Sequence, residues 1–125
     1  MTGLNKVILI GNLGADPEIR TTQSQKTVAT LDLATTETYR VGGEKRQTTE
    51  WHRVVLWNHL AEIAEKYLTK GRQIMVEGRI SYRKWKGNGR FTRTITEITA
   101  DTMLMLGTKT EPVAEEVEEM KELPF

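Results

Sequence analysis

The 125-residue sequence predicts an all-β protein with one helix, a five-stranded Greek-key barrel with the helix between strands three and four. Three observations lead to this fold class. Several segments of strand length alternate between apolar and polar residues, one segment has the period of an amphipathic helix, and Gly or Asn residues separate the segments. The length fits one domain, and a hydrophobic content of 38% is that of a globular protein.

The first predicted strand is Lys6–Ile10, a run of apolar residues that ends at a glycine. Because these apolar residues are consecutive, both faces of the strand should be covered. The barrel interior covers one face. We expect a second subunit on the other face, at Val7 or Leu9, whichever points outward. Residues 11–14 and 16–17 have the composition of turns.

The second predicted strand is Thr27–Thr38, which has one apolar face and ends at Tyr39. A polar, basic loop is expected over Val41–Thr49, which contains two adjacent glycines and the pair Lys45-Arg46. This loop leads directly into the third strand.

The third predicted strand, Glu50–Trp57, carries the strongest indication of function. Alternate residues of a strand point to opposite faces, so Trp51, Arg53 and Trp57 share one face and the other face is apolar. Two indoles with a guanidinium between them suit nucleic acid, because bases stack on aromatic rings and cations meet phosphates. The alternative interpretation is that both tryptophans belong to the core.

A helix is predicted next, because apolar residues recur at helical spacing from Leu60 to Leu68. Asn58 precedes the pattern as a candidate N-cap, Lys70 is expected in the last turn, and Gly71 marks the end.

The last two strands are predicted to form a hairpin. Ile74–Trp85 alternates as the fourth strand, Gly87–Gly89 supplies the turn, and Arg90–Leu106 returns as the fifth strand. Apolar residues change phase within the fifth strand, and a β-bulge near Glu97 would reconcile them. Three strands, a helix and a hairpin form the element order of the OB-fold, whose grooved face binds oligonucleotides or oligosaccharides.

The formal net charge of +1 combines two opposed regions. Residues 109–125 hold two lysines and six glutamates, a charge of −4, so residues 1–108 carry +5. We therefore expect an OB-fold domain over residues 1–108 and a short, disordered acidic tail over residues 109–125. Such charge asymmetry hints at binding to nucleic acid.

Other classes of protein are disfavoured by the composition. Without cysteine there is no disulfide, thiolate nucleophile or Cys-ligated zinc. His52 and His59 lie on different elements and form no catalytic triad. No apolar run approaches the roughly 20 residues of a membrane span, and no signal peptide precedes the first strand, so we expect a cytoplasmic protein. A metal-dependent nuclease is the alternative from another class, suggested weakly by Glu37, Glu44 and Glu50 around the basic loop.

Aromatic residues recur at strand ends and beside cations. They include all three tryptophans of the chain, a distribution that favours base stacking with phosphate neutralisation over core packing. The candidate DNA-binding residues are Tyr39, Arg40, Lys45, Arg46, Trp51, Arg53, Trp57, Lys70, Arg72, Arg83, Lys84, Trp85, Lys86 and Arg90.

Several segments together indicate a family: Asn5–Gly14, Asp16–Glu18 with Arg20, Thr49–Leu56, Leu60–Glu62, Tyr67-Leu68, Glu77-Gly78, Arg83–Trp85 and Met103–Gly107. Over about residues 4–107 the sequence resembles the bacterial single-stranded DNA-binding proteins. The resemblance implies an OB-fold homotetramer, associated with the nucleoid, that binds single-stranded DNA during replication, recombination and repair. It implies no cofactor, no metal and no catalysis.

The resemblance also implies roles for individual residues. The base-stacking positions would be Tyr39, Trp51, Trp57 and Trp85. Tyr39 stands where the family commonly has tryptophan and Trp57 where it commonly has phenylalanine, but both remain aromatic. His52 and Gln73 match family positions at subunit contacts.

The C-terminal residues Glu122, Leu123, Pro124 and Phe125 resemble the family tip that docks replication and repair proteins. Here the long linker that usually precedes the tip is nearly absent, so the reach of the tail is expected to be short. An accessory primosomal, plasmid or phage protein of the same fold, with a narrower role, is the alternative within this class.

Overall fold

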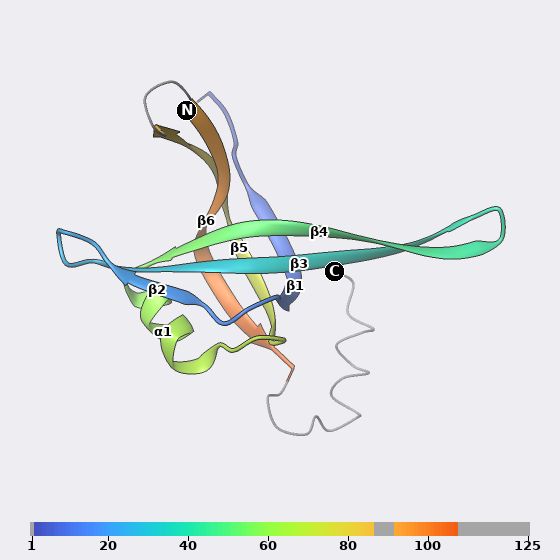
Figure 1. Cartoon of the computed structure of the whole chain (residues 1–125), viewed down its shortest axis with the longest axis horizontal. Coiled ribbons are helices and arrows are strands. Elements are labelled where there is room, and N and C mark those ends of the chain that lie inside the picture. The colour runs from blue at the N-terminus through green and yellow to red at the C-terminus, as the bar shows by residue number, and fades with distance from the viewer. Residues whose placement is uncertain (1, 87–91, 108–125) are drawn as a thin grey trace.

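A computed structural model describes residues 2–86 and 92–107 (Figure 1). The elements are β1 (Val7–Leu13), β2 (Glu18–Thr21), β3 (Thr27–Val41), β4 (Glu44–Trp57), α1 (His59–Tyr67), β5 (Gln73–Lys86) and β6 (Thr92–Leu106). The predicted turn at residues 87–89, Arg90 and the acidic tail lie outside the described residues. Among the residues described, no helix is long and apolar enough to cross a membrane.

Five strands close into a barrel. Neighbouring strands follow the order β1-β5-β6-β4-β3, and β1 closes the ring by pairing with β3 at Leu13↔Leu33. The β4–β6 pair is parallel and the other pairs are antiparallel. With α1 between β4 and β5, this arrangement confirms the predicted OB-fold. Strand β2 is an addition that pairs with β3.

The inner face of the barrel holds the core. Its largest fully buried side chains are Leu31, Leu33, Val54, Leu56, Ile74 and Val76. They occupy alternate positions on β3, β4 and β5, as the strand period requires. Helix α1 packs against β3 and β4 and contributes buried Ala61 and Ala64. Within the barrel, one face of β3, β4 and β5 is therefore committed to packing, and the opposite face points outward.

Strand β1 continues as far as Leu13, so most of the turn predicted at residues 11–14 belongs to the strand. Gly11 and Leu13 are both buried within it. A Cβ on Gly11 would overlap the backbone carbonyl of Ala34 on β3. Glycine at this position thus allows the close approach of two strands and does not form a turn.

The loop predicted over Val41–Thr49 is instead the end of a long hairpin. Strand β3 runs to Val41 and β4 starts at Glu44, so Gly42 and Gly43 alone form the turn. Their φ values of 57° and 85° are those that a type I′ hairpin turn requires. The end of this hairpin, residues 36–49, projects away from the barrel (Figure 1) and is called the β3–β4 arm below.

The helix begins without the predicted side-chain cap. Asn58 has a φ of 54°, and its side chain makes no capping hydrogen bond. Helix α1 ends at Tyr67, which leaves Lys70 beyond its last turn. Gly71, with a φ of 90°, lies in the turn ahead of β5, where glycine adopts the left-handed backbone without strain.

The predicted bulge in the last strand exists but lies elsewhere. Glu77 and Gly78 on β5 pair with residues 102 and 100 on β6, which leaves Asp101 as the extra residue. The phase change predicted near Glu97 therefore occurs four residues later. It keeps Glu97 on the outer face of the sheet, opposite Ser81.

Candidate nucleic-acid interface

The two tryptophans of β4 lie on the outer face of the barrel. Trp51 is 62% exposed and Trp57 is 42% exposed, whereas Val54 and Leu56 between them are fully buried. The alternation predicted from the sequence is confirmed, and the interpretation of both indoles as core residues is wrong.

The outer faces of β4, β5 and β6, together with β2, form an open groove of about 540 Å³. Arg20, Arg79 and Arg83 line it, and Trp57 contributes an aromatic wall. Hydroxyl groups line it as well, from Thr21, Thr22, Ser81 and Thr99. Guanidinium and hydroxyl groups are common ligands of phosphate oxygens, and an indole offers a surface for stacking. The groove therefore combines the two chemistries that a nucleic-acid strand requires.

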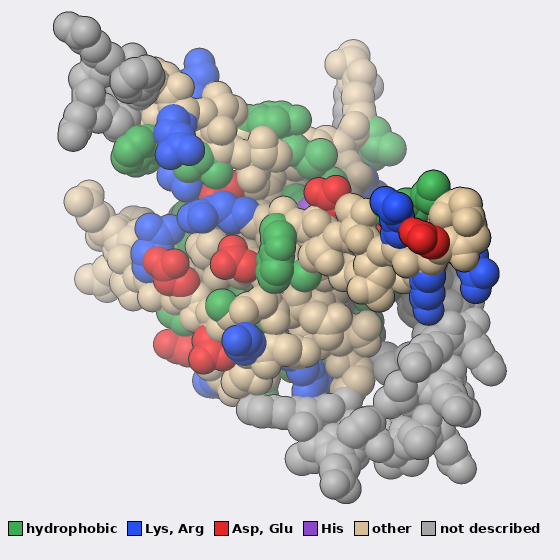
Figure 2. Space-filling view, turned by 45° about the vertical axis from the view of Figure 1, so that its right-hand side comes forward, with side chains coloured by type: hydrophobic (Ala, Val, Ile, Leu, Met, Phe, Trp, Pro, Cys, Tyr) green, Lys and Arg blue, Asp and Glu red, His purple; other side chains and the backbone are tan. Residues whose placement is uncertain are grey.

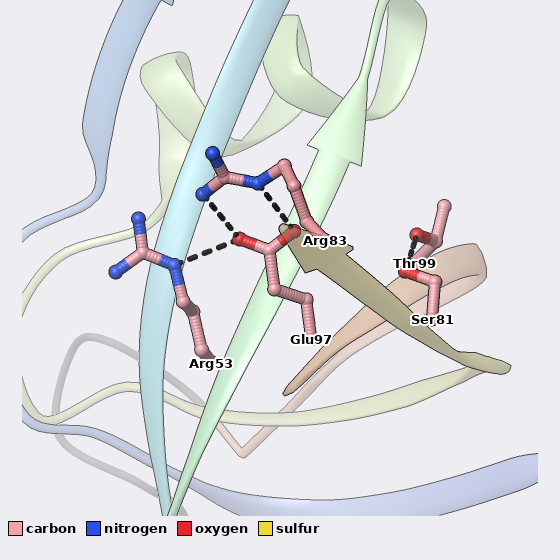
Figure 3. A network of polar contacts seen from close by, with 5 residues as sticks. All are labelled: Arg53, Ser81, Arg83, Glu97 and Thr99. Carbon is pink, nitrogen blue, oxygen red and sulfur yellow. Dashed lines mark hydrogen bonds and ion pairs between the residues drawn. The ribbon is translucent and has the colours of Figure 1, made fainter. Parts of the chain in front are cut away.

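In this groove Glu97 lies between Arg83, which also lines the groove, and Arg53, which does not (Figure 3). Arg53 Nε donates to Glu97 Oε2 at 2.9 Å. Arg83 donates two hydrogen bonds to the same carboxylate, from Nε to Oε1 at 3.3 Å and from Nη2 to Oε2 at 3.1 Å. One carboxylate thus fixes two guanidinium groups from different strands. Beside them, the hydroxyl oxygens of Ser81 and Thr99 lie 3.2 Å apart.

The ion pair between Glu97 and Arg83 shifts the pKa of both groups. Burial of Glu97 would by itself raise the pKa of its carboxyl, but the hydrogen bonds and charges of Arg83 and Arg53 together outweigh it, so the pKa lies below its usual value. The hydrogen bond to Glu97 raises the pKa of Arg83 further above an already high value. Glu97 and Arg83 are therefore both charged at neutral pH.

Trp51 lies closer to the start of β4 than Trp57 does, and it does not line the groove. A Cβ on Gly14 would overlap the six-membered ring of Trp51, so the indole rests directly on this glycine. His52, on the opposite face of β4, is partly buried, and its Nε2 lies 2.8 Å from Thr35 Oγ1. Its phase agrees with the predicted inward or interface position.

The β3–β4 arm brings an aromatic residue and cations together. Tyr39, which is 44% exposed, pairs across the hairpin with Arg46, and Arg40 pairs with Lys45. Directly paired residues lie on the same face, so the first pair offers a ring beside a guanidinium. Figure 2 shows Lys and Arg side chains gathered at the tip of the arm, where it comes forward on the right.

Trp85 continues the alternation of Arg79 and Arg83 along β5 and is 47% exposed. Lys84, also exposed, lies one residue out of phase, so it faces away from the groove side of the strand. The side chain of Lys86 and the whole of Arg90 lie outside the described residues.

Lys70 and Arg72 do not join the groove. They line a separate hollow of about 310 Å³ between α1 and β5, together with Gln73 and the end of β6. Arg72 Nη2 donates to the carbonyl oxygen of Gly107 at 3.2 Å, which ties this guanidinium to the end of the barrel. The described cations predicted as one site are thus divided among the groove, the β3–β4 arm and this hollow, and Lys84 belongs to none of them.

Strand β1, which was predicted to contact a second subunit through Val7 or Leu9, points a different residue outward. Val7 and Leu9 are partly buried and pack against the core, so neither points outward. Ile8 between them does, and it is 58% exposed. Gln73 is exposed and pairs with Asn12 at the other end of β1.

Three charged residues of the groove lining were missing from the predicted site. Arg79 could have been found, because it shares its phase on β5 with Arg83 and Trp85. Arg20 lies on β2, a four-residue strand too short and polar to give a pattern. Glu97 reaches the arginines only through the register of β5 and β6, which no local pattern contains.

Comparisons with known proteins agree with this geometry. The model of the single-strand binding protein family matches residues 4–106. A solved structure described as a Plasmodium falciparum SSB complex with ssDNA is 35% identical, with a TM-score of 0.77. That match covers 85% of this chain and 97% of the Plasmodium chain. Proteins of the family bind DNA and are not enzymes, which removes the nuclease alternative. The chain therefore belongs to the single-strand binding protein family.

Proposed function

We propose that this protein binds single-stranded DNA without sequence preference and protects it during replication, recombination and repair. The observation that carries the proposal is the arginine-lined groove beside the exposed indoles of β4. The similar Plasmodium falciparum protein, by its description, is in complex with single-stranded DNA.

The chemistry of the groove supports binding that ignores base identity. Every base has a π-face, so stacking on Trp57 or Trp51 does not select one base. Arginine forks meet phosphates, which are the same at every position of a strand. A duplex keeps its bases stacked on each other, so only an unpaired strand can use both the rings and the cations.

The test is a binding titration with labelled oligothymidylate, mixed-sequence single strands and duplex DNA across a salt series. We expect tight, nearly equal binding to both single strands, with log K falling by about 0.7 for each phosphate neutralised per unit of log salt. Equal affinity for duplex DNA, or an affinity that ignores salt, would refute the proposal.

We also propose that the protein acts as a homotetramer. An apolar strip on the outer face of β1, β5 and β6 supports this, because Ile10 pairs with Met75 and Met75 pairs with Leu104, which is 52% exposed. Ile8 lies on the same face of β1.

A charge in this strip should break the assembly and weaken DNA binding with it. Ile8→Glu should lower the mass measured by light scattering at micromolar concentration. Tyr67→Glu, at an exposed aromatic position on α1, should leave the mass unchanged. A wild-type protein that is monomeric under these conditions would contradict the proposal.

The acidic tail is proposed to dock replication and repair proteins on DNA in the nucleoid. Leu123, Pro124 and Phe125 offer an apolar anchor beside the carboxylate of Glu122, and basic pockets can capture such a segment. Deleting these three residues should abolish the capture of partners from a cell extract and leave DNA affinity equal or slightly higher at low salt. Retained partners, or lost DNA binding, would contradict the docking role.

A further inference from the structure

Glu97 is a carboxylate in a groove whose other charged lining residues are arginines. Among the described lining residues it is the one acidic side chain, beside Arg20, Arg79 and Arg83. It is buried, with 7% of its surface exposed. DNA phosphates are negative, so a carboxylate at this place opposes the proposed ligand.

The hydrogen bonds of Glu97 occupy part of the arginine donors. A guanidinium has five N–H groups. Arg53 gives one to Glu97, from Nε, and Arg83 gives two, from Nε and Nη2. Both terminal nitrogens of Arg53 make no hydrogen bond to another described residue, and the Arg53 side chain is partly exposed. The cluster of three groups carries a net charge of +1 where the two arginines alone would carry +2.

We propose that Glu97 limits the affinity of the groove by withholding one positive charge from the DNA backbone. This inference rests on the proposed binding of single-stranded DNA. Because the electrostatic contribution is smaller, stacking on the indoles supplies a larger share of the binding free energy. Binding stays reversible, and unpaired bases remain a requirement for tight binding.

The test is Glu97→Gln, which keeps the shape of the side chain and removes its charge. With one more cation free, the salt slope for single strands should steepen by about 0.7, which makes binding about 8-fold tighter at about 50 mM salt. For duplex DNA the slope should steepen by about 0.9, a gain of about 15-fold at that salt. The preference for single strands should therefore narrow about 2-fold. Extrapolated to about 1 M salt, where the counterion contribution vanishes, the variant and the wild-type protein should bind alike.

Two further variants test whether the effect depends on a charge inside the groove. Glu62→Gln removes the same charge from an exposed position of α1, and it should leave the salt slope unchanged. Thr21→Glu adds a carboxylate at an exposed position of the groove lining, and its slope should become shallower by about 0.7. Because it tests the opposite change of charge, Thr21→Glu decides the question even if Glu97→Gln does not fold.

A folded Glu97→Gln with an unchanged salt slope would overturn the inference. Weaker binding of this variant at every salt concentration would also overturn it, because Glu97 would then serve to orient the arginines. So would an unchanged slope for Thr21→Glu. If the wild-type protein does not bind single strands at all, the proposed function fails, and this inference fails with it.

Discussion

Replacing Trp51 and Trp57 separately by alanine should weaken DNA binding in both variants but lower folding stability by different amounts. Both indoles lie on the outer face of β4, so both are expected to stack on bases. Alanine substitution in single-strand-binding proteins shows that each stacked base contributes about 1–3 kcal/mol. Trp51→Ala and Trp57→Ala should therefore each weaken binding to oligothymidylate by an amount in this range, provided that each ring takes one base.

The two variants should differ in stability. Trp51 is 62% exposed and Trp57 is 42% exposed, a difference of one fifth of the residue's surface. A tryptophan presents about 250 Å², so Trp57 buries about 50 Å² more than Trp51. At about 25 cal/mol per Å², Trp57→Ala should lose about 1 kcal/mol more stability, and for a domain of this size that lowers Tm by about 4 °C more.

Fluorescence anisotropy with labelled oligothymidylate measures the binding loss, and thermal unfolding followed by circular dichroism measures the stability loss. Tyr82→Ala is the matched control. Tyr82 is 69% exposed, but it lies on β5 out of phase with Arg83 and Trp85. The argument fails if Trp51→Ala binds as the wild-type protein does, or if Tyr82→Ala weakens binding as much as the tryptophan variants.

Three other substitutions test single contacts. Because the folded-state pKa of Glu97 is depressed, its ion pairs stabilise the fold fully above the ordinary carboxyl value of 4.5 and cease to do so as pH falls through the lower folded value. The Tm difference between wild-type protein and Glu97→Gln should therefore shrink in acid, and a constant difference would contradict this. Gly14→Ala should displace the Trp51 ring and weaken DNA binding while Tm stays near the wild-type value, because the ring is free to move into solvent. Gly78→Ala should lower the free energy of unfolding by at least about 1–3 kcal/mol, and with it the urea midpoint, since its Cβ overlaps the backbone of β6. An unchanged midpoint would refute the close packing.

The sequence was informative wherever a strand has one face in the core. On β4 the alternation of large apolar and charged residues predicted the orientation of Trp51, Arg53 and Trp57 correctly. The period of α1 and the long alternation of β5 were equally reliable, because burial of one face imposes a regular pattern. Element order then sufficed to predict the OB-fold.

The pattern failed where a strand leaves the core. Residues 36–49 are exposed on both faces, so they show no alternation and have the composition of a loop. Gly11 suggested a turn, although its role is to let β1 and β3 approach each other. The groove itself depends on the register of strands far apart in the chain. Arg20, Arg83 and Glu97 line one groove only because β2 pairs with β3 at the edge of the sheet and β5 pairs with β6 in this register.

The β3–β4 arm folds without a core of its own. An isolated two-stranded hairpin is marginally stable in water, so the pairing beyond Thr36↔Thr49 should open locally at a small fraction of the free energy that unfolds the barrel. A DNA strand lying across the arm would hold it closed, and the free energy of ordering it would offset part of the contact energy. Affinity then depends on how well the hairpin folds before DNA arrives. The Gly42-Gly43 turn, which need not touch DNA at all, becomes a place where evolution or design can adjust how firmly a strand is held.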